Sequence, residues 1–495
     1  MKKIFFGSII FIFYSLCACS DFLELYPVTS LNEGNFFRTE NELILLANGC
    51  YVPMRNNTKV TKWIVAEMRS DNSSYQKPSD GGNWARVACD EFQYESNNTH
   101  FTDLWNTTYQ GIYRCNQLLG NVDRTEISWT KESYKERSKG EAYFLRALYY
   151  FDLVRQFGGV PVVKTAVSAQ DAINIKRSSV EQVYELIISD LNEAINHFRQ
   201  ATDVQENGRA NEQAAISLLG SVFLTRHAYP EAESAFNTVI SSRKYVLREN
   251  YSDLFNPSIK DYLETIFAIQ YSEANADLAN NFVFNFIPWR SGGEITNRPN
   301  VNLGNNAGFN QPTEDLINIF EPDDLRKEVA IQFWTGADWD LQIRTIPYCA
   351  KYKPPLSAPD NRCGDNFPVI RYADVLLMYA EALNMQGKTS QAIPYVEQVR
   401  TRAGLTNPLS GYDKIALEKM IADERQRELC FENHRWYDLL RTGKAIEVMT
   451  AHGQREIALK SYLSLNSYDL KEYKLLAPIP VEEILRNKIE QNPGY

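Results

Sequence analysis

The densest group of charged residues in the sequence lies at 424–441, where carboxylates and guanidinium groups alternate. Paired carboxylates at such spacing can perform acid and base catalysis. In a helix, however, Glu424 and Glu428 lie one turn apart beside Arg425 and Arg427, a pattern that also predicts ion pairs between packed helices. We favour this structural interpretation for the motif and for Arg371, Asp374 and Glu381. The motif comprises Glu424, Arg425, Arg427, Glu428, Arg435, Asp438 and Arg441.

The histidines and cysteines offer no metal-ligand pattern. The five His are scattered without a pair at helical spacing, so we predict no metal site. The eight Cys form no Cys-x-x-Cys, and the chain has no glycine-rich phosphate loop or nucleophile motif, so we predict no cofactor. Cys349 and Cys363 flank a proline-rich segment and could pair outside the cytoplasm, although we expect most of the thiols to be isolated and buried.

Aromatic residues are the more promising binding groups, at 12% of the chain. An aromatic ring offers an apolar platform that matches the C–H face of a sugar, while nearby polar groups bind its hydroxyls. Trp105, Trp129 and Trp436 fall in or beside helical patterns and are expected to be core residues. The remaining five lie in or beside predicted loops. These are Trp63, Trp84, Trp289, Trp334 and Trp339.

Two of these tryptophans have polar neighbours that could form a sugar subsite. Trp84 is close in sequence to Asn83, Arg86 and the turn from Asp71 to Tyr75, and Trp289 is followed by Arg290. For each tryptophan, packing onto the scaffold explains the sequence equally well. The leading ligand-binding candidates are Asp71, Tyr75, Asn83, Trp84, Trp289 and Arg290. The lower-ranked candidates are Trp63, Trp334 and Trp339.

The overall composition limits the classes of protein to consider. The chain has 495 residues, a formal net charge of -10 and a pI near 5.3. No basic surface is visible, so we predict no nucleic-acid binding. A hydrophobic content of 44% is typical of a globular protein, and the length exceeds what one small core organises.

The N-terminus has the pattern of an export signal. Lys2 and Lys3 precede the apolar run IFFGSIIFIFYSL, which is too short to span a membrane comfortably. The following LCAC resembles the lipobox of bacterial lipoproteins, which implies that Cys19 becomes the lipidated N-terminus and that Cys17 is removed. An ordinary signal peptide with two incidental cysteines is the alternative. Acyl chains would anchor the protein to a membrane without spanning it.

Helical periodicity dominates the mature chain. We predict a helix at about 39–52, a long loop at 69–100, and amphipathic helices from residue 101 that end at Gly158 and Gly159. The next helix begins with Ser178 and Glu181 in capping-box register. Residues 210–241 and 371–405 resemble tetratricopeptide units of two antiparallel helices. Between these units, 245–366 lacks helical period apart from TEDLINIF, so we expect loops and a few short strands there.

Eight segments, in order, resemble the SusD/RagB family of outer-membrane nutrient-binding lipoproteins of the Bacteroidetes. They are CSDFLEL, GEAYFLRALYYFDLVRQFGGVPVV, PTEDLINIFEPDDLR, FPVIRYADVLLMYAEALN, VRTRAGL, ERQRELCFENHRWYDLLRTGK, LLAPIPVEEI and QNPGY. The resemblance implies a mostly α fold, in which four tetratricopeptide-like helical pairs support a loop-rich ligand region with few short strands. It also implies a binding protein that is not an enzyme, with ligand contacts near Trp84 and Trp289.

The resemblance leads to a division of the chain and to expected partners. We expect a lipoprotein signal at 1–18, a SusD-like N-terminal domain at 19–230, and a RagB/SusD domain at 231–495, with an insertion at about 245–366 and C-terminal helices at 367–495. The protein would be anchored in the outer membrane and face the cell exterior, where it would capture oligosaccharide and deliver it to a SusC-like TonB-dependent transporter. A peptide-binding member of the family, or a transporter lid without ligand affinity, is the alternative. Ser20, Asp21 and Glu24 resemble the acidic surface-export signal of these bacteria.

Overall fold

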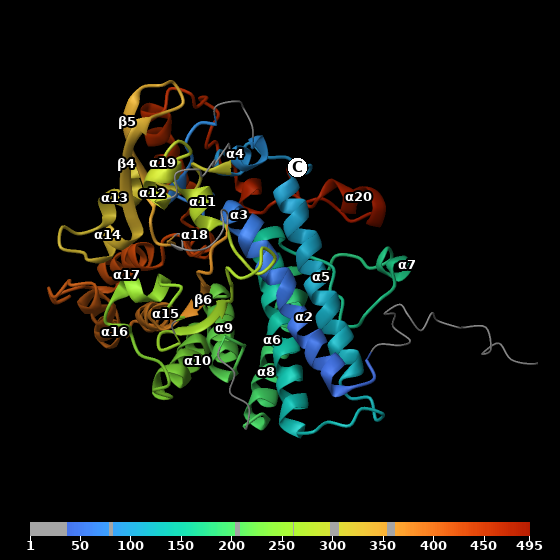
Figure 1. Cartoon of the computed structure of the whole chain (residues 1–495). Helices are drawn as coiled ribbons and strands as arrows, with labels where there is room; N and C mark the ends of the chain where they lie inside the picture. Colours follow the sequence, from blue (N-terminus) through green and yellow to red (C-terminus); the bar gives the residue numbers. More distant parts are fainter. Residues whose placement is uncertain (1–36, 79–82, 203–207, 261, 298–305, 354–361) are drawn as a thin grey trace, which may run out of the picture.

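The computed structural model describes residues 37–78, 83–202, 208–260, 262–297, 306–353 and 362–495. Cys17, Cys19 and the rest of the predicted export signal lie outside the described residues. The described chain is mostly helical, as predicted, and its buried apolar side chains form one continuous core (Figure 1). None of the helices in these ranges combines the length and the apolar character needed to cross a lipid bilayer.

Long helices form the N-terminal half, and polar residues cap several of them. Thr39 and Glu42 make a capping box at the start of the first helix, and Gly158, with a φ of 74°, ends α6 where the sequence predicted. The elements are α2 (Glu40–Asn57), η2 (Thr58–Lys62), α3 (Trp63–Val65), β1 (Ser73–Ser74), α4 (Trp84–Asp90), α5 (Thr99–Asn121), α6 (Glu132–Phe157), α7 (Ala169–Ala172) and α8 (Val180–Gln200).

Three predictions for the N-terminal half were wrong in detail. The capping box of α8 is made by Ser179 and Gln182, one residue beyond the predicted Ser178 and Glu181, because the Ser178 N–H donates instead to the carbonyl of Val160. The first helix was predicted to end at about residue 52, but it continues through a π-helical turn to residue 65. The predicted loop at 69–100 also contains the helix α4.

Tetratricopeptide-like pairs connect the two halves of the chain. Helices α9 and α10 pack against each other, and α10 packs against α15, which belongs to a second pair 130 residues or more further along the chain (Figure 1). A Cβ on Gly220 would lie 2.5 Å from the Phe236 ring, so glycine permits the close helix contact within the first pair. These helices are α9 (Glu212–Thr225), α10 (Tyr229–Ser241), α15 (Tyr372–Met385) and α16 (Thr389–Arg402).

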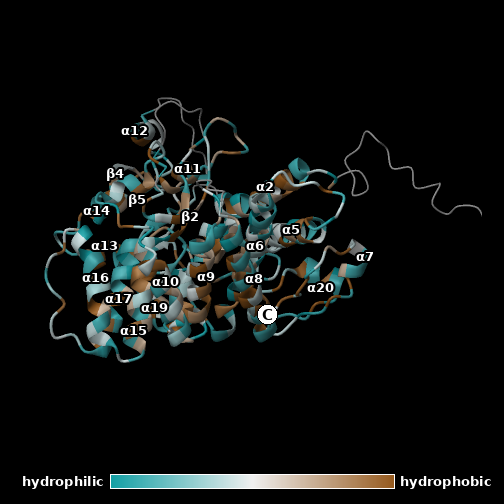
Figure 2. Ribbon diagram, turned by 90° about the horizontal axis from the view of Figure 1, so that it is seen from below, coloured by the Kyte–Doolittle hydropathy of each residue, from teal (hydrophilic) through white to brown (hydrophobic). Residues whose placement is uncertain are grey.

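Apolar and polar residues alternate along these helices at helical spacing. Figure 2 shows hydrophobic and hydrophilic segments following one another along the same ribbons. The four helices of the two pairs bury the aliphatic and small residues that the sequence placed on one face, among them Ala215, Ala232 and Ala392. The helical scaffold therefore forms because each amphipathic helix covers the apolar face of a neighbour.

The predicted insertion forms short helices and strands at the upper end of the view in Figure 1. Three antiparallel strand pairs, β1–β3, β2–β6 and β4–β5, are the only sheets in the described part of the chain. The elements are η3 (Tyr251–Phe255), β2 (Thr265–Ile269), α11 (Phe282–Phe286), α12 (Gly292–Thr296), β3 (Gln311–Pro312), α13 (Glu314–Ile319), α14 (Arg326–Ala330), β4 (Ile331–Ala337), β5 (Ile343–Cys349) and β6 (Phe367–Arg371).

Five further elements complete the C-terminal part. They are α17 (Lys414–Leu429), α18 (Arg435–Arg441), α19 (Ala445–Leu459), η5 (Glu472–Leu475) and α20 (Val481–Asn487). Helix α19 ends beside the β4–β5 hairpin, and the segment that follows it returns to the N-terminal half, where the Tyr468 N–H donates to the carbonyl of Glu91. The C-terminal segments thereby join the loop-rich end to the helical scaffold.

Candidate ligand-binding site

A cavity of about 280 Å³ opens at the loop-rich end of the molecule. Its walls come from the segment after β1, from β3 and α13, from the β4–β5 hairpin and from the end of α19. This volume is close to the lower limit of about 300 Å³ that is typical of small-molecule sites. Of the predicted candidates, Tyr75 and Trp339 line this cavity together.

Three aromatic rings form one side of the cavity. Trp339 meets the Tyr462 ring edge to face, with centroids 6.0 Å apart, and Tyr462 lies 5.9 Å from the ring of Tyr75. The Tyr462 hydroxyl donates to the Tyr75 carbonyl at 3.1 Å, and burial raises the pKa of Tyr462 to about 12, so this hydroxyl stays protonated. Tyr75 is itself buried and donates to Glu91. The cluster offers a rigid apolar wall.

Gln76 joins three segments around the cavity. Its backbone N–H donates to the carbonyl of Gly308 at 2.6 Å, and its side-chain NH₂ donates to Asp338 at 2.8 Å. Its side-chain oxygen accepts the backbone N–H of Trp289 at 3.0 Å. The segment after β1, the turn at Trp289 and the hairpin therefore hold one another in place.

Charged groups also line the cavity. Lys460 lies 2.6 Å from Glu456, and Arg344 lies 3.3 Å from Asp338. Burial alone would lower the pKa of Lys460, but Tyr462 and Glu456 outweigh it and raise this pKa. The Lys77 ammonium lies over the Trp339 ring, 4.0 Å from its centroid. The cavity thus combines aromatic surface with hydrogen-bonding groups, the combination that suits a sugar.

Trp84 and Asn83 lie at the start of α4, at the loop-rich end of the molecule (Figure 1). Trp84 begins this helix and is 64% exposed, an unusual state for so large an apolar side chain. Asn83 precedes it in a left-handed conformation with a φ of 60°. Arg86, two residues further on, is partly buried against the rings of Trp63 and Phe309, and burial lowers its pKa to about 10. The exposed indole of Trp84 is available for contact with a ligand.

Trp289 and Arg290 lie in the turn between α11 and α12. The guanidinium of Arg290 stacks over the Trp289 ring at 4.3 Å, so the two predicted neighbours form one unit. Trp289 packs partly against the core, and its indole N–H is buried without a hydrogen-bond partner among the described residues. Trp289 and Arg290 are not among the residues that line the cavity, but the Trp289 N–H bonds to Gln76, which is.

Three other candidates occupy structural positions. Trp63 was predicted in or beside a loop, but it lies in α3, is 1% exposed and meets Phe286 edge to face. Asp71 is buried, and both of its oxygens accept from Arg435 at 2.8 and 2.9 Å. Trp334 lies in β4 with an exposure of 8%, and its N–H donates to Glu294. In this conformation, each of the three side chains contacts the protein itself.

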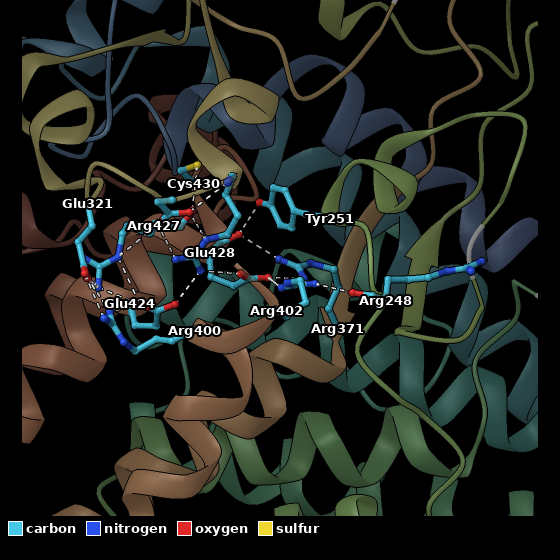
Figure 3. A network of polar contacts seen from close by, with 12 residues as sticks. Arg248, Tyr251, Glu321, Arg371, Arg400, Arg402, Glu424, Arg427, Glu428 and Cys430 are labelled. Carbon is cyan, nitrogen blue, oxygen red and sulfur yellow. Dashed lines mark hydrogen bonds and ion pairs between the residues drawn. The ribbon is translucent and has the colours of Figure 1, made fainter. Parts of the chain in front are cut away.

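The charged motif of 424–441 forms buried ion pairs, as predicted. Figure 3 shows the part of this network around Glu424 and Glu428. Arg326, 0% exposed, binds Asp324, Glu424 and Glu428. Arg371 binds Glu428 and two further carboxylates, at 2.6–2.9 Å. The four guanidinium groups of the motif itself are also paired: Arg425 with Asp374 and Asp438, Arg427 with Glu424, Arg435 with Asp71, and Arg441 with Glu381 and Asp438. The carboxylates of this motif therefore support helix packing.

The network fixes the protonation of its carboxylates. Burial acts to raise the pKa of Glu428, but the guanidinium groups of Arg402, Arg371 and Arg326 outweigh it and hold this pKa well below its usual range. The pKa of Glu424 is also lowered, because Arg326 and Arg427 outweigh its burial. Both side chains remain charged acceptors, a state that suits ion pairing and not the donation of a proton.

Neither metal nor disulfide chemistry is built into the described residues. They contain no cluster of three or more His, Cys, Asp or Glu side chains that could hold a metal ion. The six described cysteines are buried free thiols, and Cys349 and Cys363 are among them.

The sequence prediction missed several residues of the cavity. Tyr462 and Lys460 follow the end of α19 and lie more than 380 positions from Tyr75, so no local spacing could have joined them. Gln76 and Lys77 follow the predicted Tyr75, and Asp338 directly precedes the predicted Trp339. This closeness in sequence was the only signal that could have identified them.

Comparisons with known proteins point to a single family. Residues 344–495 match the model of the SusD family, and residues 21–224 match a family described as "Starch-binding associating with outer membrane". A SusD-like protein of Formosa agariphila is 29% identical over 97% of this chain and 96% of its own length. A SusD-like protein of Bacteroides ovatus is 23% identical over 86% of this chain and 79% of its own.

Solved structures share the fold. A laminarin-binding SusD-like protein superposes with a TM-score of 0.75 at 26% identity, covering 92% of this chain and 100% of that one. A SusD superfamily protein of Parabacteroides distasonis gives a TM-score of 0.76 at 27% identity, covering 94% and 100%.

Proposed function

Because the chain belongs to the SusD family, we propose that it is a glycan-binding protein of the cell surface that captures oligosaccharide and delivers it to a SusC-like TonB-dependent transporter. The observation that carries this proposal is the cavity in which Tyr75, Trp339 and Tyr462 are combined with polar and charged groups. Trp84, Trp289 and Arg290 would extend the contact surface beyond it. The fold and the family of starch-binding proteins support the proposal.

The anchoring part of the proposal rests on the sequence. Cys19 in LCAC would carry the lipid and hold the protein at the outer membrane, and Asp21 and Glu24 would direct it to the outer face. Mass spectrometry of the mature N-terminus tests this step. We expect a lipidated Cys19, and a chain that begins at another residue without lipid would contradict it.

The binding part is tested with purified protein that lacks the signal. We would screen neutral and acidic oligosaccharides, with peptides as the comparison, and measure affinities by titration calorimetry. Delivery to a transporter requires ready release, so we expect glycan Kd values in the micromolar range or weaker, about -8 kcal/mol or less favourable. Binding to peptides alone would contradict glycan capture, and binding to neither class would favour a transporter lid without ligand affinity.

The proposal does not include catalysis. The acid and base candidates of the charged motif are bound by guanidinium groups, and their lowered pKa values keep them ionised. Long incubation with any glycan that binds should therefore return it intact, as chromatography would show. Products that disappear in a variant of one carboxylate would overturn this interpretation.

A further inference from the structure

The cavity contains one cation that has no carboxylate partner among the described residues. Six charged side chains line it, and four of them form two pairs, Arg344 with Asp338 and Lys460 with Glu456. The remaining two are Lys77 and Glu314. Glu314 is exposed and accepts a hydrogen bond from Asn318 at 3.2 Å. Lys77 is half-buried, and its contacts are with aromatic rings.

The position of this ammonium is set by the residues around it. Lys77 Nζ lies 4.0 Å from the centroid of the Trp339 ring and 5.6 Å from that of Tyr462. Gln76, directly before it, is held by the bonds to Gly308, Asp338 and Trp289. The charge is therefore attached to a backbone segment with little freedom. Little further backbone entropy is therefore lost at this segment when a ligand binds.

Cation–π contact does not satisfy the ammonium. The ring faces attract its charge, but an ammonium also carries three N–H donors. These donors have no acceptor among the described residues. A negatively charged group on a ligand would supply both the acceptor and the opposite charge, and such bonds are about twice as strong as neutral ones.

From this geometry we propose that Lys77 selects oligosaccharides that carry an anionic group, the carboxylate of a uronic acid or a sulfate ester, on the sugar bound in this cavity. The inference rests on the proposed function, because it names the class of glycan for the same site. The chain's net charge of -10 repels anions at long range, but salt screens that repulsion beyond about 8–10 Å. At shorter range the Lys77 ammonium would attract an acidic group of the ligand. Lys77 also occupies one face of Trp339, so a neutral sugar would compete with it there.

The test compares matched pairs of glycans. Each acidic oligosaccharide, uronate or sulfated, is titrated beside its neutral counterpart prepared by carboxyl reduction or desulfation. The proteins are the wild type, Lys77→Met, Lys77→Arg and Lys419→Met, in which the same charge is removed from an exposed position on α17. Thermal unfolding of each variant checks that the fold is kept.

We expect the wild type to bind at least one acidic glycan about tenfold or more tightly than its neutral counterpart. Lys77→Met should remove most of that preference, while Lys77→Arg and Lys419→Met should retain it. The uronate and sulfate series identify which anion is the better ligand. Preference for the neutral member of every pair, or an unchanged preference in Lys77→Met, would overturn the inference and leave glycan binding itself intact. Binding to no glycan at all would overturn both.

Discussion

The ion-pair network and the aromatic cavity use charged groups in opposite ways. In the network, Arg326 and Arg371 are almost completely buried, and each binds three carboxylates of its own chain. In the cavity, Lys77 stands over aromatic rings, and its donors have no acceptor among the described residues. The dense charged motif therefore belongs to the scaffold of this protein, whereas the incompletely satisfied cation of the cavity is where we propose that an external anionic group binds.

Removing a guanidinium from the network should have the largest effect on stability. Arg326→Met leaves Asp324, Glu424 and Glu428 buried near one another without their shared cation. We expect a loss of about 3–5 kcal/mol in the free energy of unfolding, measured by denaturant titration. Lys419→Met, which breaks the exposed pair with Asp423, is the control and should cost less than about 1 kcal/mol. Equal losses would mean that the network adds no more than a surface ion pair.

A buried and an exposed tryptophan should likewise differ in their contribution to stability. Trp63→Ala empties a fully buried position and should lower the free energy of unfolding by about 3–5 kcal/mol. Trp84→Ala removes a side chain that is 64% exposed and should change it by less than about 1 kcal/mol. Denaturant titration of both variants measures the difference. A large loss in the free energy of unfolding for Trp84→Ala would mean that this residue has a structural role.

Acid should weaken the network by protonating its carboxylates. The folded-state pKa of Glu428 is well below the ordinary value of 4.5, so its contribution to stability is present above pH 4.5 and is lost as the pH falls through the folded value. Glu428→Gln cannot titrate. The stability difference between wild type and Glu428→Gln should therefore shrink as the pH is lowered below about 4.5. A difference that stays constant with pH would show that Glu428 is not held ionised by its arginines.

Trp84 should contribute to ligand binding on a smaller scale. If its exposed indole stacks on a sugar beyond the cavity, Trp84→Ala weakens glycan affinity by about 1 kcal/mol, roughly fivefold. Titration with a long and a short oligosaccharide checks this. The loss should be greater for the long ligand, because a short one fills the cavity without reaching α4. An unchanged affinity for both would limit the site to the cavity.

The sequence predicted the scaffold better than the site, for a physical reason. Helix periodicity, capping residues and close contacts such as Gly220 with Phe236 depend on spacing within one segment or between neighbouring helices. The motif resemblance also predicted the SusD family, which the comparisons confirm. Residues 55–62 are mostly polar, so their pattern did not indicate that the first helix continues through them. Their partners lie on other helices, as when Asn57 donates to Thr108 at 3.0 Å.

The cavity depends on contacts between distant segments. Tyr75, Trp339 and Tyr462 come from three regions that the fold alone brings together, and only the first two were candidates from the sequence. The position of Lys77 over Trp339 could not be predicted, because it follows from the bonds of Gln76 to two other segments. The candidate residues of the site remain predictions for binding experiments.

The most direct test of the central claim, that the aromatic cavity binds the glycan, is titration of Trp339→Ala with the best glycan ligand of the wild type. Removing this ring deletes one of the three aromatic rings that line the cavity and the ring face under the Lys77 ammonium, while Trp339 is not part of the hydrophobic core. We predict an affinity about tenfold or more weaker, equivalent to about 1.4 kcal/mol, with an unfolding midpoint close to that of the wild type. Wild-type affinity in a folded Trp339→Ala variant would contradict the account and place the ligand elsewhere.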